Sequence, residues 1–396
     1  MIPPLLSFLL IIALILIFSK KELSVVLGIC AIIFGLLTQV NIINSMIEVI
    51  INPSIVLLAL SVLLIPILGG IMEESGLMFE LIQKMKVSKK VALMVSPALF
   101  GLLPVAGGAL MSAPIVDQID PALDSNRKVA INVWYRHVLL LIYPLSSAIL
   151  VASVLSGISL YLIVLALLIP FFLMVFVGYF TLLKPVDKSK ESTNRNLKRV
   201  FRNLIPLIVA PVIDFLGRLF FPINFPELFI FIGLFISISI ALKFAKMNVS
   251  NIKEISRKMK VWRFPLLIIS MFLFLSIFLE SGVPEQISDL NLPFVLFISI
   301  GFFLGFTTGR VQLPSSILIP IYLVQNLVLL MPIIDFVFLY FAIYLGYLIT
   351  PLHPCLAYSI NYFKTNYIKS FKHVAIPTLI CFGILYAVFS LMLLVN

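Results

Sequence analysis

Arg310 is a charged residue in a mostly apolar stretch of the chain, between Pro293 and Leu330. A guanidinium held inside a bilayer costs roughly 3 to more than 10 kcal/mol, so something must compensate it. A bidentate clamp on a carboxylate or another oxyanion would do so. A structural pair with Glu280 or a main-chain carbonyl, or a position shallow enough for the side chain to reach water, would explain Arg310 equally well.

His353 lies where the apolar run Ile334–Ile360 is interrupted by Thr350-Pro351-Leu352-His353-Pro354. It could bind substrate or carry a coupling proton, and a satisfied buried histidine is the alternative. Ser and Thr hydroxyls at such interruptions could bind a ligand, although in membrane helices they often bond to the backbone or pack helices closely. The candidate substrate-binding residues are Gly107, Gly108, Ser112, Ser146, Ser147, Thr307, Thr308, Gly309, Arg310, Thr350 and His353. A second group consists of Arg136, His137 and Tyr143, of which Arg136-His137 could instead anchor a helix end.

The backbone around these residues is expected to be irregular. In GLLPVAGGALMSAP, residues 101–114, Pro104 stops a helix, and Gly107-Gly108 lets the chain turn and approach a ligand. The fourth apolar span is broken by Tyr143-Pro144. Irregular backbone at membrane depth is tolerated only inside protein or beside water, so we expect the site at these interruptions.

The composition decides the class of protein. Of the 396 residues, 62% are hydrophobic and 11% charged, and the mean hydropathy is +1.18. This is too little polar surface for a soluble globule, so we predict an all-α membrane protein. The net charge of +11 is assigned to loops that meet anionic lipid headgroups, and we expect no nucleic-acid partner.

Ten apolar runs are long enough to cross about 30 Å of hydrocarbon. They lie near Pro3–Phe18, Leu23–Val40, Pro53–Met72, Ile131–Leu155, Ser159–Leu183, Asn203–Leu219, Pro226–Leu242, Phe264–Glu280, Ile334–Ile360 and Lys372–Val395. Two further runs, Val91–Val116 and Pro293–Leu330, are interrupted midway by Gly, Pro and small polar residues. We interpret these two as re-entrant hairpins, each with a returning helix whose N-terminus favours an anion.

The positive charges predict the orientation. Twenty-five of the 28 Lys and Arg residues fall in five clusters: Lys20–Lys21, Lys84–Lys128, Lys184–Arg202, Lys243–Arg263 and Lys364–Lys372. Basic loops stay on the cytoplasmic side. All five clusters lie inside if the first hairpin enters from the cytoplasm and the second from outside, which places both termini outside the cell membrane.

A sequence echo indicates a duplication. Glu74-Ser75-Gly76 recurs as Glu280-Ser281-Gly282, and Pro114 matches Pro320 at the same offset. We therefore predict two repeats, 1–183 and 203–396, joined by a cytoplasmic linker, 184–202. Each repeat has five spans and one hairpin, so the second is inverted. Inverted repeats with broken helices are typical of secondary transporters.

The cysteines and the motifs argue against cofactors and enzymes. Cys30, Cys355 and Cys381 lack the paired spacing of a zinc site or a disulfide framework, and we expect no metal and no cofactor. The chain has no His-Glu-x-x-His, Gly-x-Ser-x-Gly or Gly-x-x-x-x-Gly-Lys motif. We therefore do not expect an enzyme or an ATP-driven pump.

Three motifs resemble a known family. They are GLLPVAGGALMSAPIVD at 101–117, Asn132-Val-Trp-Tyr-Arg136-His137 followed by Tyr143-Pro144-Leu145, and Tyr347-Leu-Ile-Thr350-Pro351-Leu-His353-Pro-Cys355-Leu with Asn361-Tyr-Phe363. Together they resemble a prokaryotic family of integral membrane proteins of unknown function. That family is grouped with the ion transporter superfamily, alongside arsenite, sodium/proton, gluconate, citrate and dicarboxylate permeases. The resemblance implies a scaffold and a mobile domain that carries both hairpins and moves as an elevator.

The leading hypothesis is a secondary active transporter of a small anion, in particular an organic carboxylate, coupled to H+ or Na+. A monovalent cation/proton antiporter is the alternative, weakened because Arg310 is the only charge placed at mid-depth, whereas cation sites need a buried Asp or Glu. An intramembrane enzyme is a third hypothesis. The expected partners are the anionic solute, membrane lipids and, as an open alternative, a second copy of the chain.

Overall fold

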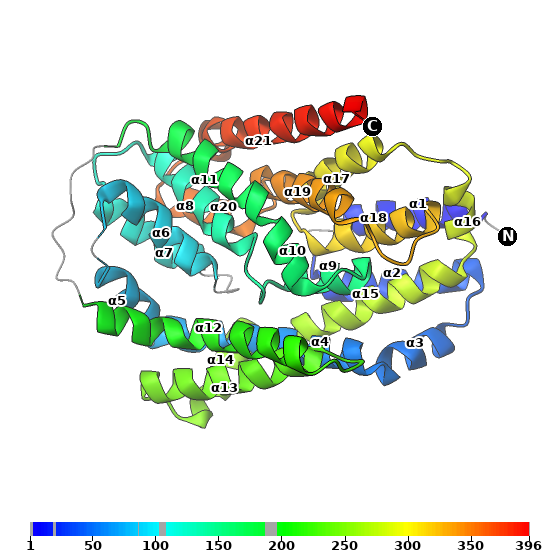
Figure 1. Cartoon of the computed structure of the whole chain (residues 1–396), viewed down its shortest axis with the longest axis horizontal. Helices are drawn as coiled ribbons and strands as arrows, with labels where there is room; N and C mark the ends of the chain where they lie inside the picture. Colours follow the sequence, from blue (N-terminus) through cyan, green and yellow to red (C-terminus); the bar gives the residue numbers. More distant parts are fainter. Residues whose placement is uncertain (1–2, 19–20, 86, 103–107, 187–195, 396) are drawn as a thin grey trace.

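The computed structural model describes residues 3–18, 21–85, 87–102, 108–186 and 196–395. Within these ranges the chain forms helices and no strand (Figure 1). The first half contains α1 (Pro4–Ile17), α2 (Leu23–Thr38), α3 (Ile42–Ile51), α4 (Pro53–Glu74), α5 (Leu77–Gln83), α6 (Lys89–Gly101), α7 (Gly108–Ile119), α8 (Ser125–Leu140), α9 (Ser147–Ser156), α10 (Leu160–Ala166) and α11 (Leu168–Leu182). The second half contains α12 (Leu197–Phe220), α13 (Glu227–Ala245), α14 (Val249–Met259), α15 (Arg263–Glu280), α16 (Val283–Ser288), α17 (Phe294–Thr308), α18 (Gln312–Gln325), α19 (Ile333–Ile349), α20 (Pro354–Tyr362) and α21 (Tyr367–Val395).

Among the described residues, seven helical segments are long and apolar enough to cross a membrane by length and composition. They are Pro53–Glu74, Leu160–Leu182, Lys198–Phe220, Glu227–Ala245, Arg263–Glu280, Ile333–Tyr362 and Tyr367–Leu394. α1, α2, α9 and α17 are apolar but shorter. The expected span Ile131–Leu155 is divided at Pro144 into α8 and α9. The chain is therefore an all-helical, multi-pass membrane protein, and the count of ten spans stays a prediction.

Local residue chemistry explains where these helices begin and end. Asn52 caps α4 by accepting hydrogen bonds from the backbone N–H groups of Ser54 and Ile55, and Pro53 occupies the first helical turn. Beyond the ends of α4 and α15, Gly76 and Gly282 adopt left-handed φ angles of +73° and +74°. Glycine is the residue that takes this conformation without strain, and it allows each chain to turn into a short helix, α5 or α16.

The contacts between helices of the two halves come in matched sets. Where a helix of the first half contacts a helix of the second, the corresponding helix of the second half contacts the corresponding helix of the first. α2 packs against α15, and α13 packs against α4. In the same way α3 contacts α15 while α14 contacts α4, and α9 contacts α18 while α20 contacts α7. In every such pair one helix comes from each half of the chain, so the halves interlock rather than fold as separate bodies.

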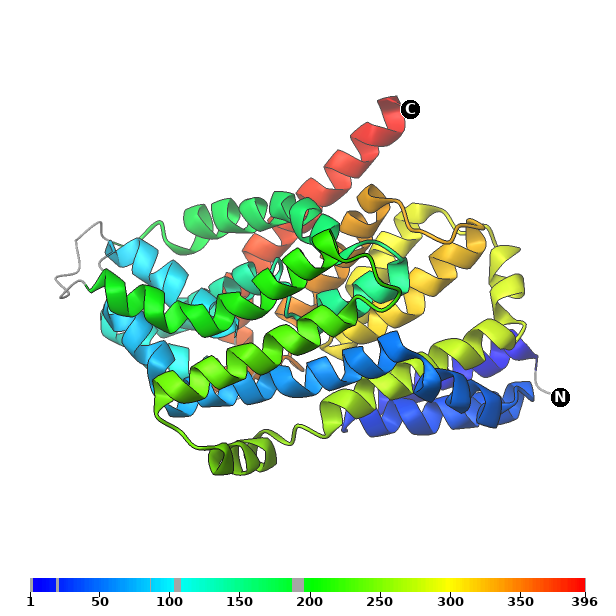
Figure 2. The same ribbon diagram turned by 60° about the horizontal axis from the view of Figure 1, so that its bottom comes forward.

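Two pairs of short helices lie toward opposite ends of the molecule. α6 packs against α7, and α17 against α18. Figure 1 shows the first pair near α5 at one end of the long axis and the second pair toward α16 at the other end. In Figure 2 most helices run along that axis, whereas α21 crosses it obliquely. Each predicted hairpin region therefore contains a pair of packed helices, and the re-entrant path of the two pairs stays a prediction.

Close backbone approach holds these pairs to their neighbours. A Cβ added at Gly101 of α6 would lie 1.9 Å from the carbonyl oxygen of Arg136 in α8. Likewise, a Cβ at Gly305 of α17 would lie 2.2 Å from the carbonyl oxygen of Ile343 in α19. These glycines allow α6–α8 and α17–α19 to pack backbone to backbone, as small residues commonly do in membrane helices.

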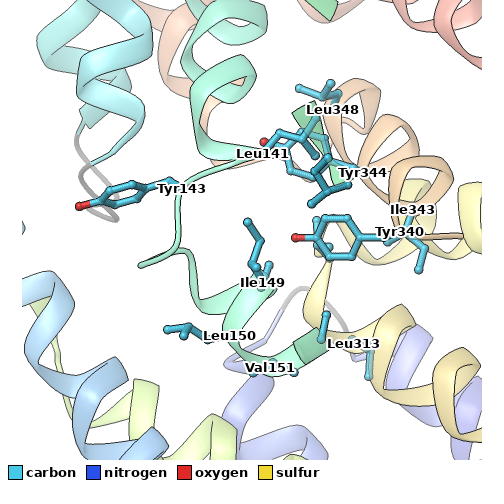
Figure 3. Close-up of a cluster of buried hydrophobic side chains, with 14 of the residues drawn as sticks. Leu141, Tyr143, Ile149, Leu150, Val151, Leu313, Tyr340, Ile343, Tyr344 and Leu348 are labelled. Atoms are coloured by element: carbon cyan, nitrogen blue, oxygen red, sulfur yellow. The ribbon is translucent and has the colours of Figure 1, made fainter. Parts of the chain in front are cut away.

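One cluster of buried hydrophobic side chains lies where the break between α8 and α9 meets α19. Figure 3 shows Leu141, before Pro144, beside Tyr344 of α19, and Ile149, after it, beside Tyr340, whereas Tyr143 points away from α19. Tyr340 and Tyr344 of α19 are buried and stack with their ring centroids 6.3 Å apart. This apolar packing supports the irregular segment between α8 and α9.

Candidate functional site

A cavity of about 630 Å³ lies where the interruptions of the helices meet. Its wall includes the start of α2, the end of α6, the break between α8 and α9, the start of α15, the turn between α17 and α18, and the break between α19 and α20. The predicted contact residues that line it are Arg136, His137, Tyr143, Ser146, Ser147, Thr308, Gly309 and Arg310. The cavity thus brings together residues from both halves of the chain.

Arg310 lies on the cavity wall directly after the turn residue Gly309, which has a left-handed φ of +63°. Its guanidinium forms no ion pair or hydrogen bond with any residue that the structure describes. Glu280, a partner considered from the sequence, is exposed at the end of α15. Glu22, which also lines the cavity, attracts this positive charge, but its 3.5 Å ion pair is with Arg263.

Arg136 contributes a second cationic side chain to the cavity. It lies in α8 and is 4% exposed, and its main chain is held against Gly101 of α6. Together with Arg263 and Arg310 it gives the wall three guanidinium groups, against the single carboxylate of Glu22. The described wall is therefore cationic, and it favours an anion by simple electrostatics.

The hydroxyl groups at the interruptions have different surroundings. Ser147 accepts a 3.0 Å hydrogen bond from the Gln312 amide, which ties α9 to α18, and Ser146 lines the cavity beside it. Thr308 donates to the carbonyl of Leu304 at 2.7 Å. The Tyr143 hydroxyl donates to the carbonyl of Leu207 at 3.2 Å and so joins the first break to α12.

The other predicted residues that the structure describes are not part of the cavity wall. Ser112 donates to the carbonyl of Ala109 at 3.4 Å, and Thr307 donates to that of Phe303 at 2.9 Å. The Thr350 hydroxyl is buried and accepts from the Leu352 N–H at 3.2 Å. Gly108 begins α7, and Gly107 lies outside the described residues.

A cluster of aromatic and imidazole rings forms the floor of the cavity, between α8 and the break that separates α19 from α20. His137 and His353 are both at least 99% buried, with ring centroids 4.5 Å apart in a T-shaped arrangement. Tyr347 stacks on His353 at 4.3 Å, and its hydroxyl lies 3.3 Å from Nε2 of His137. Sequence reasoning missed Tyr347, and also Cys355, although Cys355 stands only two residues after His353 in the same break.

A buried carboxylate, also missed from the sequence, lies away from this cavity. Asp214 of α12 is fully buried, forms a 2.9 Å ion pair with Arg218, and accepts a 2.9 Å hydrogen bond from Tyr161. The expectation that Arg310 is the only charge at depth was therefore incomplete. Because the Arg218 guanidinium already neutralises the Asp214 carboxylate, the two residues form a structural ion pair rather than a vacant cation site.

Comparison with known proteins agrees with this architecture. A family model described as "Protein of unknown function (DUF401)" matches residues 2–394. No curated protein matches the sequence. The crystal structure of the YdaH transporter from Alcanivorax borkumensis, described as having an unusual topology, is similar with a TM-score of 0.64. The match covers 89% of this chain and 87% of that chain at 13% sequence identity, so it concerns the fold alone.

Proposed function

We propose that this chain, which belongs to the family of proteins of unknown function DUF401, is a secondary active transporter of a small anion, with an organic carboxylate as the expected class. The fold that it shares with the YdaH transporter supports a transport role. A placement within the ion transporter superfamily, coupling to H+ or Na+, and location in the cell membrane with both termini outside are parts of the same proposal.

The observation that carries the proposal is the Arg310 side chain. It is partly buried, lines the cavity and has no ion pair among the described residues, although an unpaired guanidinium at membrane depth is costly. A carboxylate could satisfy two of its N–H donors at once. Arg136 would add a second positive charge on the same wall, while Ser146 and Ser147 would offer neutral hydrogen-bond donors.

The transport cycle that we propose follows from the position of the cavity. On one side it is lined by Glu22 and Leu23 of the α2 region and by Phe264 and Leu267 of α15. On the other side it is lined by the end of α6, the turn between α17 and α18, and the breaks between α8 and α9 and between α19 and α20. If α2, α4, α13 and α15 are the scaffold, sliding of the hairpin-bearing part would carry the cavity across the membrane as an elevator. The exchanged helix contacts support inverted repeats, as such a cycle requires.

Ligand-induced stabilisation of the purified protein tests the proposal. The panel would contain small carboxylates, sugar acids and inorganic oxyanions, each with matched sodium and potassium salts at two pH values. An anion present at about a hundred times its Kd should stabilise the wild type by about 2.7 kcal/mol. Arg310→Ala should abolish this stabilisation, and Arg310→Lys should retain only part of it, because lysine keeps the charge but loses the bidentate geometry.

The matched control is Arg257→Ala, which removes an exposed arginine of α14 outside the cavity and should leave the stabilisation intact. Uptake of the identified anion into proteoliposomes would then establish transport. Equal stabilisation of Arg310→Ala and wild type would reject the site. A response to sodium or pH alone, with no anion effect, would instead favour a monovalent cation/proton antiporter.

A further inference from the structure

Two segments that are far apart in the sequence bring three side chains together at the cavity wall and directly behind it. His137 comes from α8, His353 from the break before α20, and Cys355 from the first turn of α20. Their ligand atoms all lie within 4.8 Å of one another. Two imidazoles and one thiol form a donor set that soft and borderline transition metals prefer.

The hydrogen bonds of the two imidazoles define which nitrogen faces the cluster. Nδ1 of His137 lies 2.6 Å from the carbonyl oxygen of Val133, and Nδ1 of His353 lies 3.4 Å from that of Leu348. A carbonyl oxygen only accepts, so each Nδ1 carries the proton, and each Nε2 presents a lone pair. Metal-binding histidines are oriented in this way, with the other ring nitrogen donating to a carbonyl or a carboxylate.

The Nε2 atom of His353 is an independent sign of a missing ligand. It is fully buried and has no hydrogen-bond partner among the described residues. Buried polar atoms are nearly always satisfied, so an exception calls for an explanation such as an absent ion. The neighbouring Tyr347 stacks on the His353 ring and does not satisfy this atom.

Cys355 lies where a thiolate is favoured. It occupies the first turn of α20, directly after Pro354, and it lines the cavity together with His137. The free N–H groups and the positive dipole end of a helix N-terminus stabilise a thiolate, which is the metal-binding form of cysteine.

We propose that His137, His353 and Cys355 bind one soft or borderline transition-metal ion, Zn²⁺ or Cu⁺, through two Nε2 atoms and Sγ. Bonds of 2.0–2.3 Å place ligand atoms about 3.5 Å apart in a tetrahedral or trigonal site, so the three side chains would close inward by about 1 Å. When the metal binds, Nε2 of His137 would exchange its hydrogen bond with the Tyr347 hydroxyl for a bond to the ion. The thiolate would offset the repulsion from Arg136 on the same wall.

The open side of this ion would face the cavity. His137 and Cys355 are part of the cavity wall, whereas His353 lies behind it. Three protein ligands leave a zinc ion one free position, which water or an anion can occupy. The site would therefore add positive charge to a surface that already carries Arg136 and Arg310, but metal binding itself does not depend on what the protein transports.

The test uses full-length protein purified after treatment with a chelator and dialysed free of metal. Zn²⁺ and Cu⁺ would each be titrated against a chromophoric competitor, with the bound metal counted by mass spectrometry. We expect one ion per chain, and with Co²⁺ as a probe we expect a sulfur-to-cobalt charge-transfer absorption. Cys355→Ser should remove that absorption and weaken binding at least tenfold, whereas the matched control Cys381→Ser, at a buried cysteine of α21, should do neither.

A second measurement does not depend on the folding of the Cys355→Ser variant. In a Cys30→Ser, Cys381→Ser background, Cys355 is the only thiol, and bound Zn²⁺ or Cu⁺ should slow its alkylation at least tenfold. Unchanged alkylation with saturating metal would overturn the proposal. So would equal metal affinity in the Cys355→Ser and wild-type proteins, which would reveal an adventitious ion only.

Discussion

At the scale of single residues, burial and pairing distinguish structural charges from functional ones. Asp214 and Arg218 neutralise each other within α12, whereas Arg310 faces the cavity with no ion pair among the described residues. Asp214 is fully buried and paired, whereas Arg310 is only partly buried and leaves a cation available to a solute. This difference explains why the proposed transport site depends on Arg310 and not on the buried carboxylate.

Loss of the Asp214 carboxylate should destabilise the fold without changing anion recognition. Asp214→Asn leaves the guanidinium of Arg218 partly buried, 18% exposed, and without its charged partner. We expect a loss of about 3 kcal/mol in unfolding free energy, as is common when one member of a buried pair is removed. Thermal unfolding in detergent measures this loss. An unchanged midpoint, or loss of anion binding by a protein that remains folded, would contradict the structural role.

A second residue-scale prediction concerns Glu80 on α5, beyond the end of α4. A hydrogen bond from the Asn203 amide, and then contacts with Arg199 and Arg202, hold the pKa of the Glu80 carboxyl below its usual value near 4.5. A lowered folded-state pKa contributes stability above the unfolded-state pKa, and this contribution is lost as pH falls through the folded-state value. Glu80 should therefore stabilise the protein at neutral pH, and this stabilisation should decline progressively as the pH falls below about 4.5.

Glu80→Gln should lower the unfolding free energy by on the order of 1 kcal/mol at pH 7. The difference from wild type should shrink as the pH falls below 4.5, because the wild-type carboxyl then also loses its charge. Glu285→Gln, at an exposed position of α16, serves as the control. A difference that does not vary between pH 3.5 and 7 would show that the charge of Glu80 does not contribute.

At the scale of the elements, glycine contacts determine how close α6 lies to α8 and α17 to α19. Helices α1 and α2 are short, with 14 and 16 residues, and the predicted fourth span is two helices rather than one. The apolar runs therefore located helical regions correctly but did not give their lengths. The backbone contacts at Gly101, Gly305 and Gly346 then hold the broken elements around the cavity.

Gly305→Ala should be destabilising because its Cβ would lie 2.2 Å from the Ile343 carbonyl oxygen. We expect a loss of about 1–3 kcal/mol, the usual cost of overpacking a close contact. Gly383→Ala is the matched control, since no atom lies within 4 Å of its added Cβ. There the higher helix propensity of alanine should stabilise α21 by up to about 1 kcal/mol. Equal unfolding midpoints for the two variants would contradict this account of α17–α19 packing.

At the scale of the whole molecule, the two halves are related by matched contacts between their corresponding helices. α2–α15 and α13–α4 are equivalent pairs if the chain is a duplication with inverted topology. Under that interpretation α5 and α16 lie on opposite sides of the membrane, and Figure 1 shows them toward opposite ends of the molecule. The basic clusters predict that the α5 end faces the cytoplasm.

Labelling of single cysteines tests this topology. In a background without the three native cysteines, Glu285→Cys at α16 should react with a membrane-impermeant maleimide from outside intact cells, whereas Lys184→Cys after α11 should react only after permeabilisation. Both positions are exposed, so accessibility does not limit either reaction. Labelling of both from the same side would remove the inverted-repeat interpretation.

The sequence by itself determined the class of the protein, the positions of most helices and the four interruptions. These features depend on local composition: apolar runs form membrane helices, and Gly and Pro break them. The same local reasoning found Arg310 and the residues around Ser146, which do line the cavity.

Only the tertiary structure decided which interruptions meet. Cys355 looks isolated in the sequence, but the packing of α8 against α20 brings it to His137, and the α17–α18 turn places Arg310 on the same cavity. Likewise the sequence did not show that Asp214 is buried beside Arg218 and Tyr161. The physical reason is that such contacts depend on how whole helices pack, and no local pattern of residues encodes the partner that a distant helix will supply.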